Sequence, residues 1–229
     1  DAQGLWALLL QESHQHDEAR QHADAALRQN PQQLEALLAQ ASMQLETQEP
    51  DAAQVSFDTL LQAHPHCGRG WHGLGLVHLR RMQLNPAERA FEQATTHLPA
   101  HVGSWHLLAW LRVLRHDIDA AEQAFERALA LDRNFSESHG GLAVIAALQG
   151  RDADARAGIR RALRLDAQGM SAQYAELLLL QREGRDKAAA ALVEAFLARP
   201  AAPGGDMQIR DLVRRRLNAP PQRAPDPAA

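Results

Sequence analysis

Several kinds of residue recur along this chain at one fixed spacing, and that period constrains the fold more than any other feature. Alanine returns every 34 residues through most of the 229-residue sequence, at Ala19, Ala53, Ala87, Ala121, Ala155 and Ala189. The same step separates the members of three further sets, which are Phe57, Phe91 and Phe125, then Pro31, Pro65 and Pro99, then Trp71 and Trp105. A period shared by unrelated residue types indicates tandem copies of one structural unit, about six in this chain.

Each unit contains two apolar stretches with helical spacing, separated by a short polar break. In the third unit Trp71, Leu74 and Val77 belong to the first stretch, and Ala87 and Phe91 to the second. We therefore expect two helices per unit, and an array in which neighbouring units cover one another's apolar faces. The residues predicted to cap the start of the second helix are Asp17, Asp51, Asn85 and Asp119. Glu122 would complete a capping box with Asp119, and Pro86 would occupy the first helical position after Asn85.

The order of residues within the unit resembles the tetratricopeptide repeat, in which W-x-x-L-G precedes A-x-x-x-F-x-x-A and a proline. The resemblance is clearest in residues 71–99 and 105–132, and it extends over about residues 3–200. It implies an all-α, right-handed superhelical solenoid with a concave inner surface. The predicted units are 1–33, with an incomplete start, then 34–67, 68–101, 102–135, 136–169 and the degenerate 170–203, followed by a capping helix at 204–218 and a disordered Pro-rich tail at 219–229.

The pattern weakens toward the C-terminus. His139 stands where tryptophan is expected, and Arg133 replaces the proline that ends the fourth unit. In the last unit Gln173 and Glu176 occupy positions expected to be apolar, and Pro200 comes one residue early. The pattern therefore predicts the register of that unit only to within about one residue.

Composition limits the classes of partner. The chain has 28 acidic and 24 basic residues and a net charge of −4, so no overall positive field favours nucleic acid. Cys67 is the only cysteine, which excludes an internal disulfide framework. No apolar run reaches the roughly 20 residues that span a bilayer, so we expect no direct membrane insertion of this segment. Lys187 is the only lysine and alanine is abundant, which is typical of a GC-rich bacterial genome. The compartment stays open, cytoplasmic or periplasmic, as does a membrane anchor upstream of residue 1.

Residues 68–73, GRGWHG, match the G-x-G-x-x-G pattern of dinucleotide-binding loops. That pattern holds a pyrophosphate only between a β-strand and a helix, whereas the preceding FDTLLQAHPHC reads as a helix followed by proline. We therefore expect no nucleotide site. Gly68 and Gly70 are interpreted as residues of the inter-repeat turn and the first helical turn. Gly73 and Gly75 are placed within the first helix of the third unit, with Gly75 as the small residue for close packing.

No metal, cofactor or catalytic site is expected. His64, His66 and Cys67 of HPHC, with His72 nearby, could supply zinc ligands, but their spacing matches no established zinc finger. No nucleophile has a base and an orienting partner at a recognisable spacing, so the chain is predicted not to be an enzyme. The arginines of 210–216 are interpreted as the charged outer face of the capping helix rather than as a phosphate site.

The resemblance to the family assigns the concave surface to fixed positions of each first helix. Carried over by register, these positions are Leu38, Ser42, His72, Leu76, His106, Trp110, Gly140, Val144, Tyr174 and Leu178, with Arg69 and Arg80 at the edge. We expect the apolar members to bury a partner's apolar side chains, and the basic members to bind its acidic or carbonyl groups. Replacing Trp110 and Tyr174 together by alanine is expected to abolish partner binding without loss of helix.

The family's best-known groove chemistry is a carboxylate clamp of lysine, asparagine and arginine that grips the C-terminal carboxylate of a chaperone peptide. This chain departs from it, because His72 and His106 stand where a clamp lysine would be, and Leu76 and Trp110 where clamp asparagines would be. Imidazoles at these positions predict partner binding that changes between about pH 5.5 and 7.5.

The predicted function is a non-catalytic scaffold that binds a protein or peptide partner and no nucleic acid. The resemblance implies an assembly factor or co-chaperone-like adaptor of a bacterial multiprotein envelope system. Two alternatives stay open. One is the regulatory or substrate-binding segment of a larger enzyme, such as a glycosyltransferase or peptidase. The other is a structural module that forms a homo-oligomer through its end repeats.

Overall fold

Residues 2–198 are described by a computed structural model, in which they form twelve α-helices and no β-strand. The all-α class predicted from the sequence is therefore confirmed, while the predicted capping helix and Pro-rich tail lie outside the described residues. The helices are α1 (Ala2–Glu12), α2 (His16–Gln29), α3 (Leu34–Glu46), α4 (Pro50–Ala63), α5 (Gly68–Arg80), α6 (Leu84–His97), α7 (Val102–Leu114), α8 (Ile118–Leu131), α9 (Ser136–Leu148), α10 (Asp152–Leu165), α11 (Met170–Arg182) and α12 (Asp186–Leu197).

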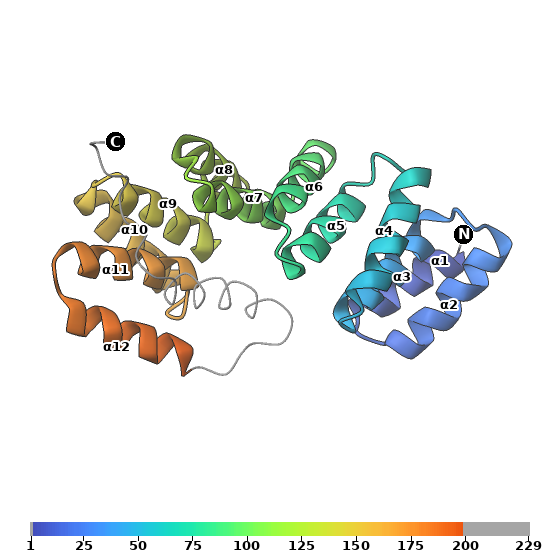
Figure 1. Cartoon of the computed structure of the whole chain (residues 1–229). Coiled ribbons are helices and arrows are strands. Elements are labelled where there is room, and N and C mark those ends of the chain that lie inside the picture. Colours follow the sequence, from blue (N-terminus) through green and yellow to red (C-terminus); the bar gives the residue numbers. More distant parts are fainter. Residues whose placement is uncertain (1, 199–229) are drawn as a thin grey trace, which may run out of the picture.

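The helix bounds repeat with the period of the sequence. From α3 onward the odd-numbered helices begin at 34, 68, 102, 136 and 170, and the even-numbered ones begin at 16, 50, 84, 118, 152 and 186. The polar substitutions of the last unit do not shift this register, since α11 and α12 begin 34 residues after α9 and α10. Figure 1 shows the helix pairs side by side in a curved row, from the blue N-terminal helices to the orange α11 and α12. None of the helices within residues 2–198 has the length and hydropathy needed to cross a bilayer.

The periodic phenylalanines pack successive helices together. Phe57 and Phe125 are 1% and 0% exposed. A Cβ atom on Gly73 would lie 2.1 Å from the Phe57 ring, and one on Gly141 would lie 2.3 Å from the Phe125 ring, so only glycine allows these contacts. Gly73 ends the GRGWHG motif and lies within α5, with a helix and a turn before it rather than a strand. The structure thus gives this glycine a packing role.

Every helix pair turns through one residue in the left-handed backbone region. These residues follow the same step of 34 and are His14, Gln48, Met82, His116, Gly150 and Gly184. A left-handed conformation costs a residue with a side chain roughly 1–2 kcal/mol. The turn is therefore imposed by the packing of the two helices, because four of the six positions adopt it without glycine.

The predicted helix caps are wrong in detail. Because α2, α4, α6 and α8 begin earlier than predicted, the proposed cap residues lie inside the first helical turn, and Pro86 is the third residue of α6. The cap of α8 is Asp117, whose carboxylate accepts from the backbone N–H of Ala120 at 3.3 Å. Aspartates in the first turn still favour helix formation, because they interact with the positive end of the helix dipole.

A hydrogen bond joins the start of several odd-numbered helices to the turn before them. Trp71 and Trp105 each donate from Nε1 to the carbonyl of the proline six residues earlier, at 2.8 Å. In the next repeat His139 Nε2 lies 2.9 Å from the carbonyl of Arg133. His139 therefore makes the same link with a different residue pair, which explains how the fold continues where the sequence pattern weakens.

Candidate binding groove

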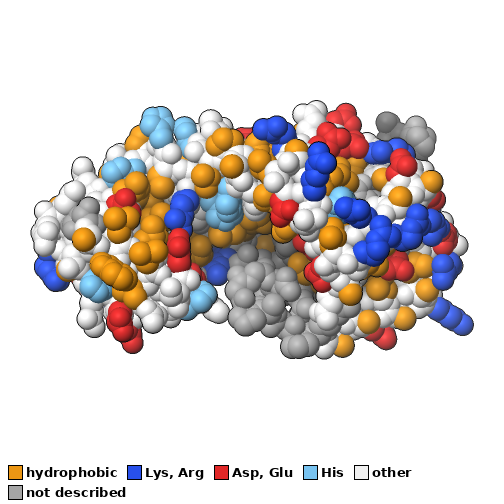
Figure 2. All heavy atoms as spheres, turned by 180° about the vertical axis from the view of Figure 1, so that it is seen from behind, with side chains coloured by type: hydrophobic (Ala, Val, Ile, Leu, Met, Phe, Trp, Pro, Cys, Tyr) orange, Lys and Arg blue, Asp and Glu red, His pale blue; other side chains and the backbone are white. Residues whose placement is uncertain are grey.

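A hollow of about 550 Å³ lies on the first three repeats, lined by residues of α1, α3 and α5, with contributions from α4 and the α6–α7 turn. We call it the N-terminal hollow. It brings together six of the predicted groove residues, which are Leu38, Ser42, Arg69, His72, Leu76 and Arg80. On the face seen in Figure 2, hydrophobic side chains gather between charged and histidine side chains.

The inner wall of the N-terminal hollow is apolar. Leu38 and Phe57 are 5% and 1% exposed and belong to the core, and half-buried Leu76 packs against the same cluster. Leu98, which follows α6, adds a further apolar side chain. An apolar partner side chain placed here would be removed from water, at about 25 cal/mol for each Å² of buried apolar surface.

The charged groups of the hollow are paired within the chain. Arg69 donates to the Glu12 carboxylate at 2.5 Å. Arg80 donates to the backbone carbonyl of Leu45. Burial lowers the pKa of Arg80, and the nearby Glu46 carboxylate partly offsets this effect, yet an arginine stays charged at neutral pH. An acidic partner group would therefore compete with Glu12 and Glu46 for these two cations.

A hydrogen-bonded chain of two histidines and one serine borders the hollow. The fully buried Ser104 hydroxyl lies 2.9 Å from His72 Nδ1 and 2.8 Å from His101 Nδ1, and the two rings meet edge to face at 4.6 Å. His101 Nδ1 also accepts from the Ser104 backbone N–H, at 3.2 Å. The network thus assigns the Ser104 proton to His101 and the Nδ1 proton to His72, which leaves His72 Nε2 as an acceptor.

His72 is consequently neutral at physiological pH. Burial lowers its pKa to about 3, with smaller contributions from the neighbouring His101 and Arg69. The expectation that His72 binds acidic groups as a cation is therefore wrong, since a neutral imidazole with a free Nε2 accepts a hydrogen bond instead. The lowered pKa places the titration of His72 below the range of pH 5.5 to 7.5.

The second half of the predicted groove is filled by aromatic side chains. Trp110 lies 5.8 Å from Phe125 and 5.9 Å from Tyr174, measured between ring centroids, and donates from Nε1 to His106 Nε2 at 3.1 Å. His106 is 7% exposed and also contacts Phe135. Burial lowers the His106 pKa to about 4. His106 is therefore a neutral member of this aromatic cluster. This differs from the expectation that His106 is a basic residue of the groove.

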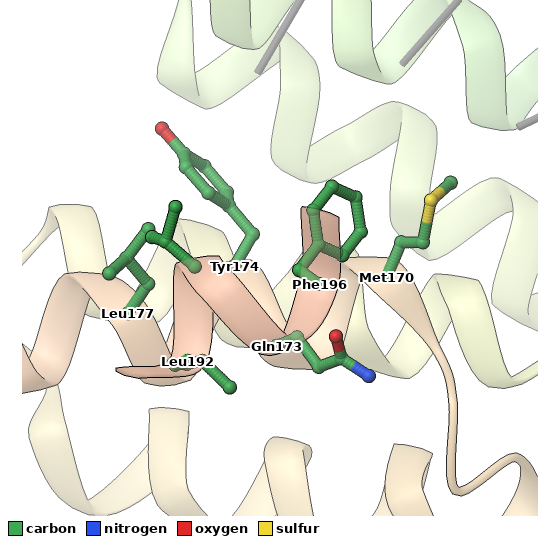
Figure 3. A pocket seen from close by; sticks show the side chains of 7 residues that line it. Met170, Gln173, Tyr174, Leu177, Leu192 and Phe196 are labelled. Atoms are coloured by element: carbon green, nitrogen blue, oxygen red, sulfur yellow. The ribbon is translucent and has the colours of Figure 1, made fainter. Parts of the chain in front are cut away.

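The remaining predicted positions are divided between the core and the last repeat. Val144 is fully buried, so it belongs to the core and not to an accessible surface. Gly140 marks a close approach of α9 to α11, because a Cβ there would lie 2.6 Å from the backbone nitrogen of Ala172. Half-buried Leu178 packs beside Val144. Tyr174 lines a small apolar pocket between α11 and α12, shown in Figure 3 with Phe196 and Leu192 of α12.

The family model of the tetratricopeptide repeat matches residues 5–54 and 106–170, together about half of the chain. The chain belongs to the tetratricopeptide repeat family. Its fold is accordingly that of a protein-interaction scaffold, a class whose members are typically non-catalytic. No curated protein sequence matches the chain.

Solved tetratricopeptide repeat structures share this fold. PilF of Pseudomonas aeruginosa is 17% identical, with a TM-score of 0.70 over 94% of this chain and 96% of that one. YrrB, described as having an unusual peptide-binding site, is 16% identical, with a TM-score of 0.62 over 84% of this chain and 97% of YrrB. TTC0263 of Thermus thermophilus is 23% identical, with a TM-score of 0.56 over 77% of this chain and 99% of TTC0263. At these identities the likeness is one of fold alone.

Sequence reasoning missed several residues of the hollow in this tetratricopeptide repeat protein. Gln11 and Glu12 come from the incomplete first unit, to which no groove position was assigned, and His101 lies in a turn. For the two glutamates of the hollow a sequence signal was present. Glu12 and Glu46 precede Arg80 by two steps and one step of 34, so all three occupy one repeat position at the edge of the concave face.

Proposed function

We propose that this chain is a non-catalytic scaffold that binds an extended or helical segment of a protein partner in the N-terminal hollow. The observation that carries this function is the convergence of apolar wall, paired cations and neutral histidine within one hollow of about 550 Å³. Such a surface suits a segment with one apolar side chain for the Leu38 and Leu76 wall. A neighbouring acidic group would reach Arg69 or Arg80, and an N–H or O–H donor would reach His72.

The family resemblance supports a finer role as an assembly factor or co-chaperone-like adaptor of a bacterial multiprotein envelope system. The peptide-binding site named for YrrB supports peptide recognition by a similar solenoid. The carboxylate clamp is not available for such a role here, because the N-terminal hollow contains arginines and histidines but no lysine.

The decisive experiment compares charge insertions at two leucines. Leu76→Glu places a carboxylate in the wall of the hollow, whereas Leu148→Glu does so at a leucine that is 43% exposed at the end of α9. Each variant and the wild type would be used to capture partners from lysate of the source bacterium, followed by titration of the purified partner segment. We expect loss of binding in Leu76→Glu alone, and equal binding by all three proteins would refute the hollow as the site.

One observation favours self-assembly as a second function. On α1, Leu5, Trp6 and Leu9 are 52%, 56% and 54% exposed, which leaves an apolar face on the first repeat. Stacking of this face on another copy would bury it. Light scattering from about micromolar to millimolar concentration tests this, with Trp6→Glu as the variant expected to remain monomeric. A wild type that is monomeric throughout the range would exclude this role.

A further inference from the structure

The turn between α1 and α2 meets the end of α3 in a cluster of three side chains that can ligate a metal. His14 is the left-handed residue of that turn, His16 is the first residue of α2, and Glu46 is the last residue of α3. One ligand atom from each lies within 4.8 Å of the other two. Among the described residues this is the only such group of three.

The spacing of these atoms fits a tetrahedral ion. Glu46 Oε2 lies 3.5 Å from His14 Nδ1 and 3.4 Å from His16 Nε2. Zinc bonds nitrogen and oxygen at about 2.0–2.2 Å in tetrahedral sites, which places neighbouring ligand atoms about 3.4 Å apart. The carboxylate oxygen is therefore as far from each histidine nitrogen as two ligands of one ion would be, and the two histidine nitrogens lie within 4.8 Å of each other.

The surroundings orient the carboxylate and leave a route to the cluster. Gln11 Nε2 donates to Glu46 Oε1 at 2.6 Å, so the other oxygen of that carboxylate faces the histidines. A hydrogen bond of this kind commonly fixes a ligating carboxylate. The His14 side chain is 78% exposed, whereas that of His16 is 31% exposed, so an ion could enter from the solvent side through His14.

We propose that His14, His16 and Glu46 form a binding site for one divalent transition-metal ion of the zinc class. Two imidazoles and one carboxylate favour zinc, copper or nickel over magnesium or calcium, which prefer oxygen ligands. Three protein ligands leave a fourth position open. Glu46 also lines the N-terminal hollow, so the proposed site adjoins the hollow.

The histidines and the cysteine of HPHC do not form an alternative metal site. His64 Nε2 lies 2.5 Å from the backbone carbonyl of Gln32, and Cys67 Sγ accepts from the Gly70 N–H. The His66 ring packs edge to face on His97 at 4.9 Å. These side chains take part in turn and cap contacts and do not converge on one point, so a matched control is available at His66.

The affinity is expected to be moderate. His16 Nδ1 is buried without a hydrogen-bond partner among the described residues, so the ring lacks the outer acceptor that usually holds a metal-bound histidine. Loss of such an acceptor typically weakens metal affinity by about 10–100-fold. The ligands must also be deprotonated, so binding releases protons and weakens in acid.

The test is isothermal titration of Zn²⁺ into the full chain, free of affinity tag and pre-treated with chelator. His14→Asn removes one ligand at an exposed position, and asparagine tolerates the left-handed backbone. Glu46→Gln removes the charge but keeps an oxygen for Gln11. We expect one ion per wild-type chain, affinity lower by about tenfold or more in both variants, and no change in His66→Asn.

Thermal unfolding with and without Zn²⁺ gives an independent readout, because an ion that binds the folded chain raises its melting temperature. The increase should be present in wild type and His66→Asn and smaller in both ligand variants, whose helix content is checked by circular dichroism. Absence of saturable binding, equal binding by wild type and the ligand variants, or loss of binding only in His66→Asn would each overturn the site.

Discussion

The two halves of the predicted concave surface share one register but differ in what occupies it. At one repeat position the residues, 34 apart, are Ser42, Leu76, Trp110, Val144 and Leu178. Where this position holds Ser42 and Leu76, in the second and third repeats, a hollow of about 550 Å³ remains. Where tryptophan enters, it contacts Phe125 and Tyr174 and fills the space between repeats. Register therefore determines which positions face inward, and contacts such as those of Trp110 with Phe125 and Tyr174 determine whether they stay accessible.

The largest expected effect is on stability and distinguishes the two halves. We call the first half, which contains the hollow, the open half, and the second, which Trp110 fills, the filled half. Trp110→Ala removes a ring that packs on Phe125 and Tyr174, so we expect the free energy of unfolding to fall by roughly 3 kcal/mol. Urea denaturation followed by circular dichroism measures this. The Trp110 and Tyr174 double substitution is then a stability variant as well as a binding variant, which is why Leu76 is the better residue for testing the groove.

Trp6→Ala is the matched control for Trp110→Ala, measured at a concentration at which the chain is monomeric. Trp6 is 56% exposed, so its removal should change stability by no more than about 0.5 kcal/mol. Similar losses at the two positions would mean that the aromatic cluster contributes no more than an exposed side chain, and the distinction between a filled and an open half would fail.

The fold was predictable because several residue types carry the same period. Alanine, phenylalanine and proline repeat together, and the helices begin at the positions this period indicates, even in the last unit. The caps were predicted less well. An aspartate such as Asp119 favours the first turn as well as the cap, and the sequence alone does not separate these positions.

The site was less predictable, because it depends on contacts between repeats. The neutral state of His72 results chiefly from its burial, and its hydrogen-bond partner Ser104 belongs to the following repeat, 32 residues away. Likewise, His14 and His16 meet Glu46 only when α1 packs on α3. A repeat pattern describes one unit at a time, so it does not report which side chains of different units converge.

A second prediction concerns acid and the buried histidine of the filled half. The unfolded chain protonates histidine near pH 6.5, whereas burial lowers the His106 pKa to about 4 in the folded chain. Between these values the unfolded state binds more protons, so stability present above pH 6.5 is lost as the pH falls. His106 alone should contribute a loss of roughly 2 kcal/mol between pH 7 and pH 5, at about 1.4 kcal/mol per pH unit.

Urea denaturation of wild type and His106→Gln at both pH values isolates this contribution, since glutamine can still accept from Trp110 and does not titrate. The variant should lose less stability in acid by the stated amount. Parallel losses in the two proteins would show that His106 is protonated as readily in the folded chain as in the unfolded one.

The third prediction compares turns that have glycine at the left-handed position with turns that have a side chain there. The left-handed residue is glycine at 150 and 184 but carries a side chain at 82 and 116. Met82→Gly should therefore stabilise the chain, and Gly150→Ala should destabilise it, each by about 1 kcal/mol. The changes in melting temperature should have opposite signs. A loss of stability in both variants would mean that Met82 contributes through contacts that outweigh its backbone conformation.

The smallest expected effect tests whether the paired cations of the open half are available to a partner. Glu12→Gln breaks the ion pair with Arg69, whose side chains are 47% and 48% exposed, so stability should change by less than about 1 kcal/mol. The freed guanidinium should then bind an acidic partner group roughly threefold more tightly, with a steeper dependence on salt. Asp152→Asn breaks the comparably exposed pair with Arg182 far from the hollow and should leave partner affinity unchanged. If Glu12→Gln weakens binding instead, Glu12 itself contacts the partner, and the hollow selects a basic group rather than an acidic one.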